Sequence, residues 1–207
     1  SPHITFCDTD YLMSLSTKQI SHGLIEVIKH ALITDSTKLK GLLKSNLEDK
    51  LNHWQKYPWD EIIYESLKVK ASIVEKDPFD RHGLQRGLNY GHTFGHSLEG
   101  LSGYQFPHGL AVGIGIKIAG YISNKLNMIT DQELAFQNEL LDLAQLDLTL
   151  SKDFNIEIFV KLLKKDKVNN GTGVRLVLLK KLGSYQLKGG VNEKLIKDTI
   201  TQHLIAK

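Results

Sequence analysis

The sequence is poor in the features that mark several classes of protein. Its 207 residues include a single cysteine, Cys7, which excludes an internal disulfide and a thiolate metal cluster. The longest apolar run, GLAVGIGIKIAGYI, contains Lys117 and is shorter than the roughly 20 residues that span a bilayer. A signal-peptide pattern is not recognisable either. We therefore expect a protein of the reducing cytoplasm without a membrane segment.

The sequence also lacks a large excess of positive or negative residues, since the net charge is only +3. The lysines are spread over many segments and do not form a basic stripe, so nucleic acid is not an expected partner. A composition of 41% hydrophobic and 24% charged residues is typical of a globular protein. A chain of this length buries one core, and we expect a single domain over residues 1–207. Because the chain starts at Ser1-Pro2 without methionine, we also expect it to be a piece of a longer protein.

Hydrophobic periodicity predicts a mainly α, multi-helical domain with one small β-hairpin near the C-terminus. Ser16 and Gln19 have capping-box spacing and predict a helix start, and Gly23 is expected to separate that segment from the next helix. The hairpin is predicted over 174–191, around a turn near Gly183. Further helices are predicted over 24–35, 59–76, 109–126, 133–146, 155–165 and 192–204.

The chemistry is expected around the stretch LNYGHTFGHSLEG, residues 88–100. His92 and His96 lie four residues apart, so on a helix both rings emerge on one face, the geometry of a metal-binding pair. The glycines at 91 and 95 each cost a helix about 1 kcal/mol relative to alanine. That cost is understandable if another backbone or a ligand must approach closely. The competing interpretation is two ordinary histidines, one packed and one solvated.

Two further residues complete the candidate metal site. His108 opens the next helix, and a helical hairpin would fold it back onto the His92 face, although it could equally be an ordinary loop histidine. Glu26 is the best candidate carboxylate, one turn from Lys29 within an apolar helix; the plainer interpretation is a solvated (i, i+3) ion pair. Histidine and carboxylate ligands suit a zinc-like ion. Cations suited to a phosphate or carboxylate are Lys70, Arg86 and residues 164–167, and Asn89 could cap the helix or bind a ligand.

Several segments resemble, in the same order, the C-terminal domain of the 3-dehydroquinate synthase family. They are LNYGHTFGHSLE (88–99), PHGLAVGIGI (107–116), GLIEVIKHALI (23–33), KVKASIVEKD (68–77) and GVRLVLLKKLG (173–183). The resemblance covers essentially the whole chain. It implies that an N-terminal NAD-binding domain, which the family possesses, is absent from these 207 residues.

The resemblance also implies the family's chemistry and the roles of individual residues. The expected reaction converts 3-deoxy-D-arabino-heptulosonate 7-phosphate to 3-dehydroquinate and phosphate in the shikimate pathway of aromatic amino acid biosynthesis, with NAD on the missing domain and Zn²⁺ or Co²⁺ on this one. A homodimer is expected for the full-length protein, and the fragment alone is expected to be inactive. The implied metal ligands are Glu26, His92 and His108, the implied catalytic residues are His96 and Lys29, and the implied substrate-binding residues are Lys70, Arg86, Asn89 and Lys167.

The chain departs from the family pattern at three places. Gln85 stands where an arginine is common, with Arg86 next to it. Leu110 replaces the acid of the family's His-Gly-Glu, which is expected to loosen support for His108. The Asp-Lys-Lys motif appears as Lys165-Asp166-Lys167, which keeps only Lys167 in register.

These departures keep other functions open. One is a related sugar-phosphate cyclase, which would act on a different phosphorylated ketose. Another is a metal-dependent alcohol dehydrogenase-like domain, which would transfer hydride without releasing phosphate. A third, from a different class, is a metal-binding or interaction module without chemistry of its own.

Overall fold

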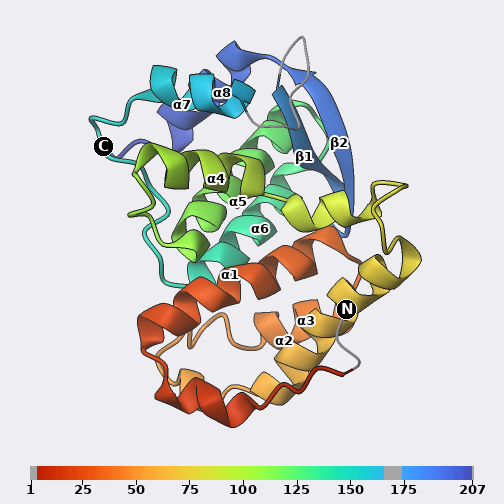
Figure 1. Ribbon diagram of the computed structural model, residues 1–207. Helices are drawn as coiled ribbons and strands as arrows, with labels where there is room; N and C mark the ends of the chain where they lie inside the picture. Colours follow the sequence, from red (N-terminus) through yellow and green to blue (C-terminus); the bar gives the residue numbers. More distant parts are fainter. Residues whose placement is uncertain (1–3, 166–173, 207) are drawn as a thin grey trace.

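The computed structural model describes residues 4–165 and 174–206 (Figure 1). It confirms a mainly helical architecture with one two-stranded antiparallel hairpin near the C-terminus. The elements in chain order are η1 (Thr9–Ser14), α1 (Thr17–Ile33), α2 (Thr37–Lys44), η2 (Trp54–Lys56), α3 (Trp59–Lys76), η3 (Leu84–Asn89), α4 (His92–Leu101), α5 (His108–Lys125), α6 (Asp131–Leu143), α7 (Ile156–Lys165), β1 (Val174–Lys181), β2 (Ser184–Val191) and α8 (Glu193–His203).

Helix α1 begins at the predicted capping box but does not stop at Gly23. The Ser16 hydroxyl accepts from the Gln19 backbone N–H, and the Gln19 side chain accepts from the Ser16 N–H. The predicted break at Gly23 is wrong, because α1 continues to Ile33. A helical glycine costs about 1 kcal/mol, whereas each buried aliphatic side chain of this helix contributes roughly 1.5–3 kcal/mol. Burial of the apolar side of α1 therefore outweighs the glycine.

Helix α1 lies between two groups of elements. It packs against α3 on one side and against α5 on the other. In Figure 1, α2 and α3 lie below α1, and α4 to α8 with the hairpin lie above it. Side chains of α1 can therefore reach both groups of helices.

Helices α4 and α5 form the predicted helical hairpin, in unusually close contact. Gly91 is the N-cap of α4 with φ +81°, a left-handed conformation that favours glycine, so it stands at the helix start and not inside the helix. A Cβ on Gly115 of α5 would lie only 2.0 Å from the Gly91 carbonyl oxygen. The expected close approach of a neighbouring backbone is confirmed. Asn89 does not cap α4, since it closes the preceding η3 turn.

The C-terminal part packs onto the outer side of α5. Strands β1 and β2 pair with Val177 opposite Leu187 and turn at Gly183, as predicted. The β1 side chains of Leu176, Leu178 and Leu179 are buried, and β1 contacts α5. Across the described part of the chain, no helix combines the length and the apolar character needed to cross a membrane.

Candidate metal centre

Three helices bring one carboxylate and two imidazoles together. Glu26 lies in the middle of α1, whereas His92 and His108 are the first residues of α4 and α5. Glu26 Oε1 lies 3.5 Å from His92 Nε2 and 3.8 Å from His108 Nε2. Ligand atoms of the three residues all lie within 4.8 Å of one another. The predicted return of His108 onto the His92 face is confirmed.

The two oxygens of Glu26 have different surroundings. Oε2 accepts from the Lys29 ammonium at 2.5 Å, and Lys29 is only 3% exposed. The pair is therefore not the solvated (i, i+3) pair of the simpler interpretation. Oε1 is buried and has no hydrogen-bond partner within the described residues. An unpaired buried carboxylate oxygen is costly, unless a cation binds there.

The outer contacts of the two imidazoles determine where their lone pairs lie. His92 Nδ1 lies 3.3 Å from the Tyr90 carbonyl oxygen, and His108 Nδ1 lies 3.0 Å from Glu99 Oε1. Both oxygens accept hydrogen bonds, so in the neutral imidazole each Nδ1 carries the proton and each Nε2 presents its lone pair. In that form, two nitrogen lone pairs converge on Glu26 Oε1 with no proton between them. This arrangement is repulsive by itself and suits a shared metal ion.

The spacing agrees with tetrahedral coordination. A zinc ion about 2.0–2.2 Å from each ligand places neighbouring ligand atoms about 3.3–3.6 Å apart. The separations of 3.5 and 3.8 Å between Glu26 Oε1 and the two Nε2 atoms are close to that range. Three protein ligands would leave a fourth position open, as in catalytic rather than structural zinc sites. The residues present therefore fit the metal that the family resemblance implies.

The electrostatics keep His92 and Glu26 in the forms that bind metal. Burial and the nearby Lys29 ammonium lower the pKa of His92 to about 4, so its imidazole is neutral near pH 7. Burial tends to raise the pKa of Glu26, but its ion pair with Lys29 outweighs this and holds the pKa below its usual value. Burial lowers the pKa of Lys29, against the attraction of Glu26. Neutral imidazole and ionised carboxylate are the metal-binding states.

The predicted catalytic residues lie beside this cluster. The His96 ring centroid is 5.5 Å from that of His92 and 6.3 Å from that of His108, and His96 is exposed. Lys70 is exposed on α3, and its charge helps to lower the pKa of Lys29. The structure thus brings His96 and Lys29, and Lys70 at longer range, to the same region.

The other predicted substrate contacts lie on η3 or outside the described residues. Arg86 is exposed on η3, and its one ion-pair partner among the described residues is Asp80, at 3.9 Å. Asn89 is exposed at the end of η3. Gln85 takes part in the preceding turn, where its amide donates to the Asp77 carbonyl. Lys167 lies outside the described residues.

Three residues near the centre were missed by sequence reasoning. Glu99 contacts His108; its position seven residues after His92 on the same helix face was the available signal. His30 is 6% exposed, and its Nδ1 lies 2.8 Å from the Ser66 hydroxyl of α3. Gly109 lies against α1, where an added Cβ would approach the His22 carbonyl oxygen to 2.4 Å. Nothing in the local sequence of His30 or Gly109 marks these tertiary contacts.

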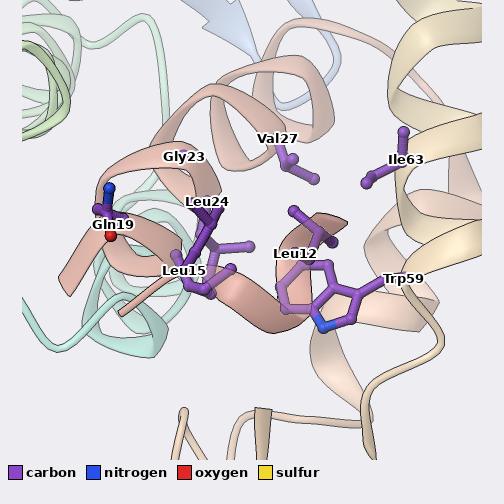
Figure 2. Close-up of a pocket in the computed structure, with 9 residues that line it drawn as sticks. Leu12, Leu15, Gln19, Gly23, Leu24, Val27, Trp59 and Ile63 are labelled. Atoms are coloured by element: carbon purple, nitrogen blue, oxygen red, sulfur yellow. The ribbon is translucent and has the colours of Figure 1, made fainter. Parts of the chain in front are cut away.

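Helix α1 borders two cavities. One, of about 150 Å³, is almost wholly apolar and lies between η1, α1 and α3, where Leu12, Val27, Trp59 and Ile63 face one another (Figure 2). The other, of about 410 Å³, is lined by residues that include Lys18, His22 and Asp147. The described residues form no second cluster of metal-ligating side chains, so the Glu26 site is the candidate functional centre.

The fold matches that of two solved synthases. The structure of ValA, a 2-epi-5-epi-valiolone synthase from Streptomyces hygroscopicus with NAD⁺ and Zn²⁺ bound, superposes with a TM-score of 0.79 at 19% identity, over 94% of this chain and 53% of that one. A 2-deoxy-scyllo-inosose synthase complexed with carbaglucose-6-phosphate, NAD⁺ and Co²⁺ superposes with a TM-score of 0.78 at 22% identity. The match covers 95% of this chain and 55% of that one. The chain is thus a helical domain with the fold of these structures and a candidate metal centre.

Sequence comparison specifies the family. The family model described as 3-dehydroquinate synthase C-terminal matches residues 23–169. A 3-dehydroquinate synthase of Methylococcus capsulatus is 37% identical over 96% of this chain and 55% of its own length. That of Rippkaea orientalis is 32% identical over 96% of this chain and 54% of its own length. The chain belongs to the 3-dehydroquinate synthase family and corresponds to its C-terminal domain. It spans about half the length of these curated relatives.

Proposed function

We propose that this chain is the metal- and substrate-binding part of an enzyme that converts 3-deoxy-D-arabino-heptulosonate 7-phosphate to 3-dehydroquinate and phosphate. The observation that carries the proposal is the convergence of Glu26 Oε1 with the Nε2 atoms of His92 and His108, beside the buried Lys29. Membership of the 3-dehydroquinate synthase family supports the choice of substrate.

Each residue at the centre has a proposed task. Glu26, His92 and His108 would hold Zn²⁺ or Co²⁺, which supplies Lewis acidity toward substrate hydroxyls when bound. Glu26 Oε2 fixes the Lys29 ammonium at the edge of the cluster, where it would bind an anionic group of the substrate. The exposed His96 imidazole would exchange a proton with the substrate near its phosphate. Lys70, Arg86, Asn89 and Lys167 are the further proposed substrate contacts.

The rest of the proposed enzyme lies outside this chain. An N-terminal NAD-binding domain would complete the active site, in a homodimeric enzyme of the cytoplasm and the shikimate pathway. The relatives' length supports this, and so do the NAD⁺-bound cyclases of the same fold. Without that domain we expect no turnover by the 207 residues, and a measurable rate from the isolated chain would refute this part of the proposal.

Metal analysis tests the centre itself. The purified chain should hold one zinc-type ion, and the double variant His92→Ala, His108→Ala should hold none, measured by mass spectrometry of metals after dialysis. Circular dichroism of both proteins controls for loss of folding. Equal metal content in the folded wild type and the folded double variant would exclude the proposed ligands.

Substrate assays separate the leading function from its alternatives. The protein extended by its NAD-binding half should release phosphate from 3-deoxy-D-arabino-heptulosonate 7-phosphate. A related cyclase is the second candidate, favoured by the fold shared with ValA and by Leu110 in place of the family's acid. Activity only with another phosphorylated ketose would support that candidate. Reduction of NAD⁺ without phosphate release would instead indicate an alcohol dehydrogenase.

A further inference from the structure

The two histidines of the metal centre have unequal support. The His92 side chain is 12% exposed and is held by burial and by a neutral backbone carbonyl. The His108 side chain is 50% exposed, at the start of α5 after the loop from α4. An exposed ligand at a helix terminus has little packing to fix its ring. His108 therefore depends on a polar contact for its orientation.

Glu99 supplies that contact. Its Oε1 lies 3.0 Å from His108 Nδ1, and its side chain is only 14% exposed. The carboxylate comes from the last turns of α4, the helix that begins with His92. One rigid helix thus supplies a ligand at its start and the support for a second ligand near its end.

The backbone of Glu99 also organises the loop that leads to His108. Its carbonyl oxygen accepts from the Tyr104 N–H at 2.7 Å and from the Ser102 hydroxyl at 3.0 Å. The same Ser102 hydroxyl accepts from the Phe106 N–H at 3.1 Å. These bonds fold the α4–α5 connection back over Glu99, so that its carboxylate and the His108 ring meet.

We infer that Glu99 is the positioning residue of the metal centre, which holds His108 in its Nδ1–H tautomer with Nε2 aimed at Glu26. This inference rests on the proposed metal site. A carboxylate on the outer nitrogen fixes the ring and increases the basicity of the ligating nitrogen, and loss of such a partner weakens metal binding about 10–100-fold. It also explains how His108 is supported although Leu110 replaces the acid next to it: Leu110 is partly buried and packs against the core.

The test is zinc affinity, measured by chelator competition on the 207-residue chain and its variants. We expect Glu99→Ala to bind zinc about 10–100-fold more weakly than wild type. Glu99→Gln keeps a neutral acceptor for the Nδ1–H and should be intermediate, which a purely steric role of this position would not produce. Glu157→Ala, which removes an exposed carboxylate paired with Lys197, is the matched control and should bind zinc like wild type.

A second readout does not need the metal. In the metal-free chain at mildly alkaline pH, ¹⁵N chemical shifts of His108 should show the Nδ1–H tautomer in wild type and a shift toward Nε2–H in Glu99→Ala. An unchanged tautomer, or equal zinc affinity in wild type and Glu99→Ala, overturns the inference while leaving the three ligands intact. Failure of wild type to bind zinc, with the expected tautomers present, would instead overturn the proposed function.

Discussion

Two neighbouring faces of α1 lead to different kinds of surroundings. One face carries Glu26 and Lys29, whose charges are held beside the histidines of α4 and α5. The next face carries Gly23 and Val27, which border the apolar cavity shared with η1 and α3 (Figure 2). Residues of the two faces are interleaved within the single helix α1. The faces differ in role because different elements pack against them.

The two faces of α1 differ in how closely other elements pack against them. On the first face α5 is packed so tightly that a Cβ on Gly109 would overlap the backbone of His22. On the second face a Cβ on Gly23 would meet nothing within 4 Å. Close packing fixes the positions of side chains. The closely packed face is accordingly the one where Glu26 must stay in position relative to His92 and His108.

The largest expected effect comes from Glu26→Gln on the polar face. This change removes a metal ligand and leaves the buried Lys29 without its counter-charge, so we expect zinc content at background and a loss of about 2–3 kcal/mol of stability in urea. The partial exposure of Glu26, 36% of its side chain, keeps this below the cost of a fully buried pair. Adding Lys29→Met should restore stability but not zinc; zinc binding by Glu26→Gln at wild-type affinity would contradict the assignment.

A pH titration of stability tests His30, which follows Lys29 on α1. Burial and the neighbouring Lys29 charge lower the pKa of His30 from 6.5 to about 4, so the unfolded chain takes up a proton in this window before the folded chain does. Stability of the metal-free chain should fall as the pH falls from about 6.5 to 4, with His30 contributing on the order of 3 kcal/mol over the whole window. His30→Gln should reduce the pH dependence and leave the part due to His92, whose pKa is lowered similarly; identical pH profiles for both proteins would show that His30 does not stay neutral.

Gly109→Ala tests the close approach of α5 to α1. Its Cβ would lie 2.4 Å from the His22 carbonyl oxygen, and backbone atoms can move only if α5 shifts. We expect a loss of about 1–3 kcal/mol in thermal or urea unfolding. Because His108 precedes Gly109, zinc affinity should fall as well. Unchanged zinc affinity would mean that the centre tolerates displacement of α5.

Gly23→Ala on the open face should have the smallest effect, and of opposite sign. The position is helical with space for a methyl group, so alanine should stabilise the chain by about 0.4–1 kcal/mol and leave zinc binding unchanged. Urea denaturation of Gly23→Ala beside Gly109→Ala measures the contrast directly. A destabilised Gly23→Ala would show that this face is packed as closely as the other.

The local patterns predicted most of the helices and much of the site. The capping box at Ser16 marked the start of α1, and apolar periodicity predicted α6 over 133–146, where the structure has a helix from Asp131 to Leu143. The four-residue spacing placed His92 and His96 on one face. Glycine propensity misled the prediction at Gly23, because burial outweighs a local cost of about 1 kcal/mol. The roles of Arg86, Asn89 and Lys167 stay predictions from the family resemblance.

Glu99 and His30 show what a linear pattern does not contain. Glu99 contacts His108 nine residues later through a loop that its own backbone folds, and His30 meets Ser66 of another helix, 36 residues away. Most of the helices, their apolar faces and a set of residues able to bind metal follow from the linear order of residues, since these depend on local periodicity and side-chain chemistry. The division of the two Glu26 oxygens between Lys29 and the histidines comes from the packing of α4 and α5 against α1, which no local pattern contains.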